Sequence, residues 1–182
     1  MWTAGGDILP LELPSPDSVP KAAATLLADM VIRAAFGQPS VFTEDAYRIL
    51  AITDPPARDR LRPRLTAVLD ILRQTTGKRP VDTAWSALVA AVGTESGRQF
   101  PRRHPTHTEP LGWLRDFLLR SVAAPVPGLT VHQAKGREWD AVGVRLTDTE
   151  QAALQIGLDP LNSNHRIIYV ALTRATSTVV GV

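Results

Sequence analysis

The chain has 182 residues, enough for one ordinary domain or two small ones. Hydrophobic residues make up 44% and charged residues 21%, a composition that excludes a wholly disordered chain. The absence of cysteine excludes disulfides, cysteine zinc sites and thiol nucleophiles. No stretch approaches the ~20 apolar residues that span a bilayer, and residues 1–13 have no basic region before an apolar run, as a signal peptide would. We therefore expect a cytoplasmic protein with no membrane partner.

Arginine dominates the positive charge. Of the 20 basic residues 17 are arginine, yet 18 acidic residues leave a net charge of only +2. A chain rich in Ala, Arg and Pro is typical of high-GC coding sequence, whereas arginine is also well suited to phosphate. The alternating Arg58, Arg60, Arg62 and Arg64 do not share one helix face. They therefore indicate a solvated surface rather than a designed nucleic-acid-binding patch.

The first two-thirds of the chain have helical periodicity. Residues 1–17 are interrupted by prolines and are expected to form a short strand or extended linker. A helical subdomain is predicted over residues 18–125, with Ser18 as a cap, Gly37 as a stop and Asp82 as a later cap. Its helices are expected at about 18–37, 43–51, 56–75, 82–92 and 109–123, with a loop over 93–110.

The pattern changes at Gly128. Residues 129–132, 141–146 and 178–182 are rich in β-branched side chains and predict three short strands. A helix capped by Asn162 or Ser163 is predicted to run to Ala175, and its apolar residues on nearly all sides indicate burial. Strands alternating with helices are typical of a parallel sheet, so residues 126–182 are expected to be α/β.

Two segments of this last third could carry chemistry. The first is a polar turn after the strand at 129–132, where Gly136 can adopt a positive φ and let the backbone approach a ligand. An ordinary strand-to-helix turn would look the same. The second is Arg174 at the end of the apolar helix. It could stabilise the helix dipole or bind an anion such as phosphate.

Together the two segments resemble the C-terminal part of the UvrD/PcrA/Rep-like superfamily 1 DNA helicases. TVHQAKGREWDAV at 130–142 is similar to their fifth motif, T-x-H-x-x-K-G-L-E-[FW], and YVALTRA at 169–175 is similar to their sixth. The resemblance covers residues 128–182. It implies part of a RecA-like sheet of the P-loop NTPase type, preceded by the helical insertion of the second motor domain. Arg137 in place of leucine, and Asn164 and His165 in place of acidic residues, indicate a divergent member.

The resemblance also implies roles for single residues. Thr130 and His132 would approach the backbone of single-stranded DNA, and Lys135 would shape the turn beside it.

On the nucleotide side, Gly136 belongs to the same turn, Glu138 would reach the ribose, and Arg174 would be the catalytic arginine finger on the γ-phosphate. Tyr169 and Thr173 would position the helix that carries it, Tyr169 by packing.

The chain has no Walker loop, G-x-x-x-x-G-K-[ST], and no paired acids after an apolar strand. The resemblance thus implies the C-terminal domain of an ATP-dependent, 3′–5′ helicase. The binding of ATP and Mg²⁺ would require an N-terminal motor domain that carries that loop. No cofactor is expected to bind tightly to this chain, and no ATP hydrolysis is expected from it alone. Two alternatives are a non-catalytic DNA- or protein-binding module derived from a helicase, and a structural remnant. The motifs do not distinguish DNA repair from recombination or defence.

Other patterns are weaker. His104 and His107 have only Glu109 nearby as a third ligand, so a metal site is not expected. Four tryptophans could stack on bases, but Trp85 and Trp113 fall on apolar helix faces and are expected in the core.

Overall fold

The computed structural model describes residues 8–10, 15–37, 39–76, 79–120 and 126–181. The chain divides into two compact units, which we call the helical unit (Asp7–Pro127) and the C-terminal unit (Gly128–Val182). Each unit is described by itself.

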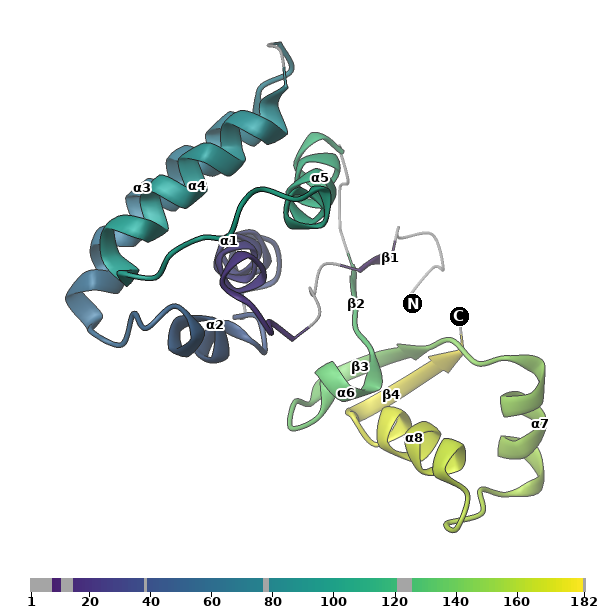
Figure 1. The fold of residues 1–182 in the computed structure, drawn as a ribbon. Helices are drawn as coiled ribbons and strands as arrows, with labels where there is room; N and C mark the ends of the chain where they lie inside the picture. Colours follow the sequence, from purple (N-terminus) through teal and green to yellow (C-terminus); the bar gives the residue numbers. More distant parts are fainter. Residues whose placement is uncertain (1–7, 11–14, 38, 77–78, 121–125, 182) are drawn as a thin grey trace. The chain divides into compact units, whose positions relative to one another are not determined.

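The helical unit contains the predicted helices. They are α1 (Val19–Phe36), α2 (Thr43–Ile49), α3 (Pro55–Arg73), α4 (Pro80–Ser96) and α5 (Pro105–Leu119). Figure 1 shows α3 and α4 side by side, with α1 and α5 packed next to them. A short strand, β1 (Ile8–Pro10), pairs with β2 (Val126–Gly128).

One apolar core holds these helices together. Along α3, buried side chains recur every three or four residues, so that they share one face. That face packs with buried residues of the neighbouring helices, including Leu26 and Leu27 of α1, Leu88 and Val92 of α4, and Leu111 and Leu114 of α5. The sequence periodicity therefore predicted these core residues correctly.

Helix boundaries differ from the prediction around the prolines. The expected loop at 93–110 is present but shorter, over residues 97–104, because α4 continues to Ser96 and α5 begins at Pro105. Proline fits the first helical position, whose amide has no partner within the helix. Asp82 is not the cap of α4, since that helix begins at Pro80. Gly37, as predicted, ends α1 with a positive φ of 70°.

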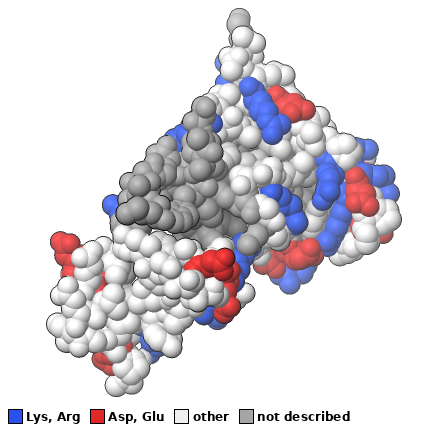
Figure 2. Space-filling view, turned by 180° about the vertical axis from the view of Figure 1, so that it is seen from behind, with Lys and Arg blue, Asp and Glu red and all other residues white. Residues whose placement is uncertain are grey.

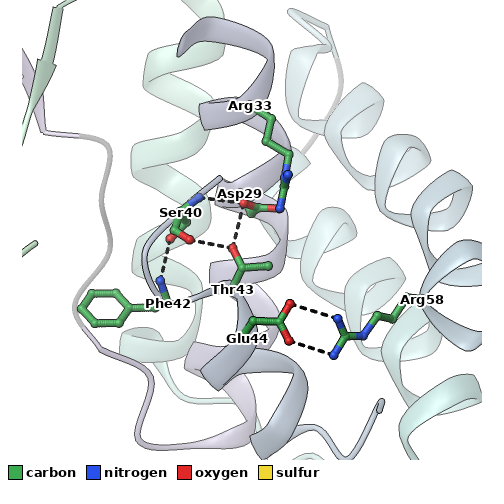
Figure 3. A network of polar contacts seen from close by, with 7 residues as sticks. All are labelled: Asp29, Arg33, Ser40, Phe42, Thr43, Glu44 and Arg58. Carbon is green, nitrogen blue, oxygen red and sulfur yellow. Dashed lines mark hydrogen bonds and ion pairs between the residues drawn. The ribbon is translucent and has the colours of Figure 1, made fainter. Parts of the chain in front are cut away.

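A buried carboxylate joins α1 to α2 (Figure 3). Asp29, which is only 6% exposed, accepts hydrogen bonds from the Ser40 amide (2.8 Å), the Thr43 hydroxyl (2.8 Å) and Arg33 Nε (2.7 Å). These bonds offset the cost of burying the charge. They fix the turn that brings α2 back along α1.

The arginines of α3 are largely paired with acidic residues. Arg58 makes two 3.0 Å bonds to Glu44 and lies 4.0 Å over the Tyr47 ring. Arg60 and Arg64 both pair with Glu95. Figure 2 shows charges of both signs interspersed over the helical unit. This arrangement agrees with a mixed, solvated surface rather than one basic face.

The C-terminal unit is a small α/β arrangement. It contains α6 (Val131–Ala134), β3 (Trp139–Val144), α7 (Asp148–Ile156), α8 (Ser163–Leu172) and β4 (Ala175–Gly181). Strands β3 and β4 pair in parallel, with Val142 opposite Val179 and Val144 opposite Gly181. The expected parallel pairing is therefore present, with α7 and α8 in the connection between the strands (Figure 1).

Two expectations for this unit are wrong, and one helix was missed. Residues 129–132 are not a strand, because Thr130 caps α6 and the chain turns at once. Helix α7 was not predicted. Helix α8 is not buried all round: Ile168 and Ala171 are buried, whereas Tyr169 is 61% exposed, so the packing role predicted for Tyr169 is not met within this unit.

Apolar side chains lie open on the C-terminal unit. Ile156 and Leu161 are 89% and 86% exposed, and Val179 and Val180 of β4 are also accessible. The face of this unit visible in Figure 2 is mostly uncharged. A parallel sheet is usually covered on both faces, and within the described residues these side chains have no such cover.

Leu88→Ala tests the core of the helical unit. Leu88 is fully buried, so the substitution should lower the free energy of unfolding by about 2–5 kcal/mol through lost burial and a cavity. Urea denaturation followed by circular dichroism measures the change. Leu119→Ala, at the partly exposed end of α5, is the matched control and should have a much smaller effect. Equal losses would contradict the assigned core.

Thr147→Val tests the start of α7. The Thr147 amide and hydroxyl donate hydrogen bonds to Glu150 and hold the pKa of its carboxyl below the ordinary value of 4.5. Because this pKa is lowered, the contribution of the carboxylate is present above about 4.5 and lost as pH falls through the folded value. In Thr147→Val, NMR titration of Glu150 should give a higher midpoint. An unchanged midpoint would show that the hydroxyl does not hold the carboxylate.

Candidate functional site

The polar turn of the first motif is built around α6. The Thr130 amide donates to Gln133 Oε1 (2.7 Å), and the Gln133 amide donates to the Thr130 hydroxyl (3.4 Å), a reciprocal cap that starts the helix. Ala134 is buried and anchors it. Gly136 then reverses the chain with a φ of +79°, a conformation that side chains with a Cβ rarely adopt. The turn therefore has a defined shape.

The three DNA candidates all lie on this turn. Thr130 caps α6, His132 lies on it and Lys135 follows its last residue. All three are exposed. They span six consecutive positions, so the structure brings them together on one accessible segment. The Thr130 hydroxyl accepts the Gln133 amide and still has its own proton to donate.

Arg174 lies where α8 passes into β4. Its Nε donates to the Val170 carbonyl at 3.1 Å, its Nη1 to the Arg137 carbonyl at 3.4 Å and its Nη2 to the Thr173 hydroxyl at 3.3 Å. Two of these acceptors belong to the end of α8, as the favourable position of a cation at a helix C-terminus predicts. The remaining acceptor, the Arg137 carbonyl, belongs to the turn of the first motif. We call this set of three bonds the Arg174 clasp.

The backbone of Arg174 makes a second connection to the same segment. Its carbonyl accepts the Trp139 amide at 2.9 Å, at the start of the pairing between β3 and β4. Arg174 is therefore bonded to residues on both sides of Glu138, which is exposed. The structure thus brings Arg174 together with the Gly136–Glu138 segment, although the two motifs are far apart in the sequence.

Residues that depart from the family pattern have roles in the loop before α8. The Asn162 side chain accepts the amides of Asn164 and His165, which confirms the predicted cap. His165 Nδ1 accepts the Asp159 amide at 3.0 Å. The substituted residues thus begin α8 and hold the preceding loop. Sequence reasoning missed the His165 contact, because nothing in the spacing marks Asp159 as its partner.

The two histidines before and within α5 make contacts that support the local structure. His107 stacks on Trp85, and its Nδ1 accepts the His104 amide, while His104 Nδ1 accepts the Thr106 amide at the start of α5. In the part of the chain that the structure describes, no three His, Asp or Glu residues are arranged to hold a metal ion. Trp85 is buried as expected, but Trp113 is 54% exposed, so its predicted place in the core is wrong.

No described helix is long and apolar enough to cross a membrane.

Comparison with known proteins agrees with the two motifs. Residues 128–180 match the family model of the UvrD-like helicase C-terminal domain. Neither the curated proteins nor the solved structures contain a match to the chain. The matched range includes the α6 turn, both strands of the parallel pair and the Arg174 clasp. Residues 128–180 are therefore a UvrD-like helicase C-terminal domain, the family that the motifs at 130–142 and 169–175 indicated.

Proposed function

We propose that this chain supplies the C-terminal motor part of an ATP-dependent DNA helicase. The observation that carries the proposal is the Arg174 clasp. In it Arg174, the residue expected to bind phosphate, is hydrogen-bonded to the turn that carries the residues expected to bind DNA. The C-terminal unit would belong to a RecA-like sheet. The helical unit would be the insertion that this family places within its second motor domain.

Arg174 is the proposed catalytic residue. A guanidinium is positively charged and can bind phosphate oxygens with two N–H groups. Placed on the γ-phosphate, it would stabilise the negative charge that develops during hydrolysis. Glu138 and Gly136 would contact the same nucleotide, because the Arg174 side chain and backbone are bonded to their neighbours, Arg137 and Trp139. ATP and Mg²⁺ would be held jointly with the other motor domain.

Thr130, His132 and Lys135 are the proposed single-stranded DNA contacts. A motor must bind any sequence, so contacts to the sugar-phosphate backbone suit it better than contacts to bases. The exposed positions of these residues on α6 support that role. By resemblance to the family, translocation would run 3′ to 5′, and the protein would act in the cytoplasm on DNA undergoing repair or a related process.

The proposed partner is a motor domain that carries the phosphate-binding loop. The open apolar residues of the C-terminal unit support the need for further protein around it, since a parallel sheet is usually covered on both faces. The second candidate function, a non-catalytic DNA-binding module, shares the DNA contacts but does not require Arg174. The two functions are therefore separated by the role of this arginine.

Lys135→Ala tests the DNA contacts. Removing one phosphate contact should weaken binding to a fluorescent oligo-dT and reduce the slope of log K against log salt by about 0.7. Fluorescence anisotropy over a salt series measures both quantities. His132→Ala should also weaken binding. Arg145→Ala, an exposed basic residue after β3, is the matched control and should leave both quantities unchanged; equal effects at positions 135 and 145 would argue for non-specific attraction.

An ATPase assay tests the dependence on the partner domain. Because the 182-residue chain has no Walker loop, it should not hydrolyse ATP when single-stranded DNA is added. Phosphate release is measured with and without oligo-dT, and with Arg174→Ala as the control for contaminating activity. DNA-stimulated hydrolysis that disappears in Arg174→Ala would contradict the proposal of a half-site.

A further inference from the structure

Thr173 connects the last turn of α8 to the Arg174 guanidinium. Its hydroxyl donates to the Val170 carbonyl at 3.1 Å and accepts Arg174 Nη2 at 3.3 Å. A hydroxyl has one proton and two lone pairs. Because the proton is directed to Val170, the lone pairs are available to Arg174. The hydrogen bond to the Val170 carbonyl thereby fixes the direction from which the Thr173 hydroxyl can accept a hydrogen bond.

The Val170 carbonyl completes this arrangement. As one of the last four carbonyls of α8, it has no amide partner within the helix. It accepts both Arg174 Nε and the Thr173 hydroxyl at 3.1 Å, which accounts for its two lone pairs. Arg174 and Thr173 therefore satisfy the helix end together, and each bond restricts the other side chain.

The clasp leaves part of the guanidinium unused. Arginine has five N–H donors, one on Nε and two on each terminal nitrogen. The three bonds of the clasp use one donor on each nitrogen. Within the described residues, one N–H on Nη1 and one on Nη2 are therefore left. A pair of N–H groups on the two terminal nitrogens binds an oxyanion in a bidentate manner when both point away from Nε.

We infer that Thr173 is a positioning residue that holds the Arg174 guanidinium in place, so that its two remaining N–H groups receive a phosphate oxyanion without rearrangement of the side chain. The inference rests on the proposed function, in which Arg174 contacts phosphate, and adds the residue that orients it. An arginine restrained before binding loses less conformational freedom when the anion arrives. Thr173 would thus act through Arg174 and would not touch the nucleotide.

The test uses the 182-residue chain and NMR of the Arg174 side chain, assigned by its loss in Arg174→Lys. Restricted rotation about the Cζ–Nη bonds gives separate signals for the terminal nitrogens at low temperature. Wild type and Thr173→Ser, which retains the hydroxyl, should show separate signals. Thr173→Val, which has the same shape without the hydroxyl, should show merged signals. Separate signals in Thr173→Val would overturn the inference.

A titration with inorganic pyrophosphate connects this restraint to anion binding. Wild type and Thr173→Ser should shift the Arg174 signals at the same midpoint, whereas Thr173→Val should need about three- to tenfold more pyrophosphate, the effect of one hydrogen bond. Thr149→Val, on an exposed position of α7, is the matched control and should equal wild type. Circular dichroism checks that all variants fold.

The two ways to fail are distinguishable. If pyrophosphate binds Thr173→Val as tightly as wild type, Thr173 does not position Arg174, and the proposed function stands. If pyrophosphate does not shift the Arg174 signals in wild type, the proposed phosphate contact fails, and the inference fails with it.

Discussion

The C-terminal unit depends on the hydrogen bonds of Arg174. Its backbone carbonyl accepts the Trp139 amide and its side chain donates to the Arg137 carbonyl, while its Nε caps the end of α8. One residue therefore joins the helix, the parallel strand pair and the turn that follows α6. A change in that turn would move an acceptor of the guanidinium, so the candidate DNA segment and the candidate phosphate ligand are mechanically linked.

The two units differ in how they are stabilised. The helical unit has a continuous core to which α1 to α5 all contribute. In the C-terminal unit, the buried apolar residues are few, among them Ala134, Ile168 and Ala171, and large apolar side chains remain accessible. Burial of apolar surface is the main source of folding free energy. The C-terminal unit would therefore gain stability from protein packed against it, as a complete motor domain would provide.

The helices of the first unit could be predicted because their apolar residues recur at a strict helical spacing. Leu61, Leu65, Val68 and Leu72 define one face of α3, and all four are buried. The start of α5 could not be predicted in the same way, because Pro105 and the histidines beside it have loop-like composition. A cap made by two imidazole nitrogens leaves no spacing signal. Trp113 was misplaced because periodicity indicates which residues share a face but not whether a neighbour covers that face.

The candidate site, like the fold, could be predicted from the sequence only in part. The motifs identified the residues around Gly136 and Arg174, and the family match covers them. Local pattern alone predicted a strand at 129–132, where the reciprocal hydrogen bonds of Thr130 and Gln133 favour a helical turn instead. The Arg174 clasp could not be read from sequence, because one of its acceptors is the Arg137 backbone carbonyl, a group that every residue carries.

The proposed role of Arg174 is to act on the phosphate of a nucleotide held by a second motor domain. The most direct measurement is the DNA-stimulated rate of ATP hydrolysis by this chain joined to a domain that carries the phosphate-binding loop, compared between wild type and Arg174→Lys. Lysine keeps the positive charge but cannot bind bidentately or reproduce the clasp. If Arg174 contacts the γ-phosphate, kcat should fall by about 10³-fold or more in Arg174→Lys, with oligo-dT affinity retained. An unchanged kcat would contradict the proposed role.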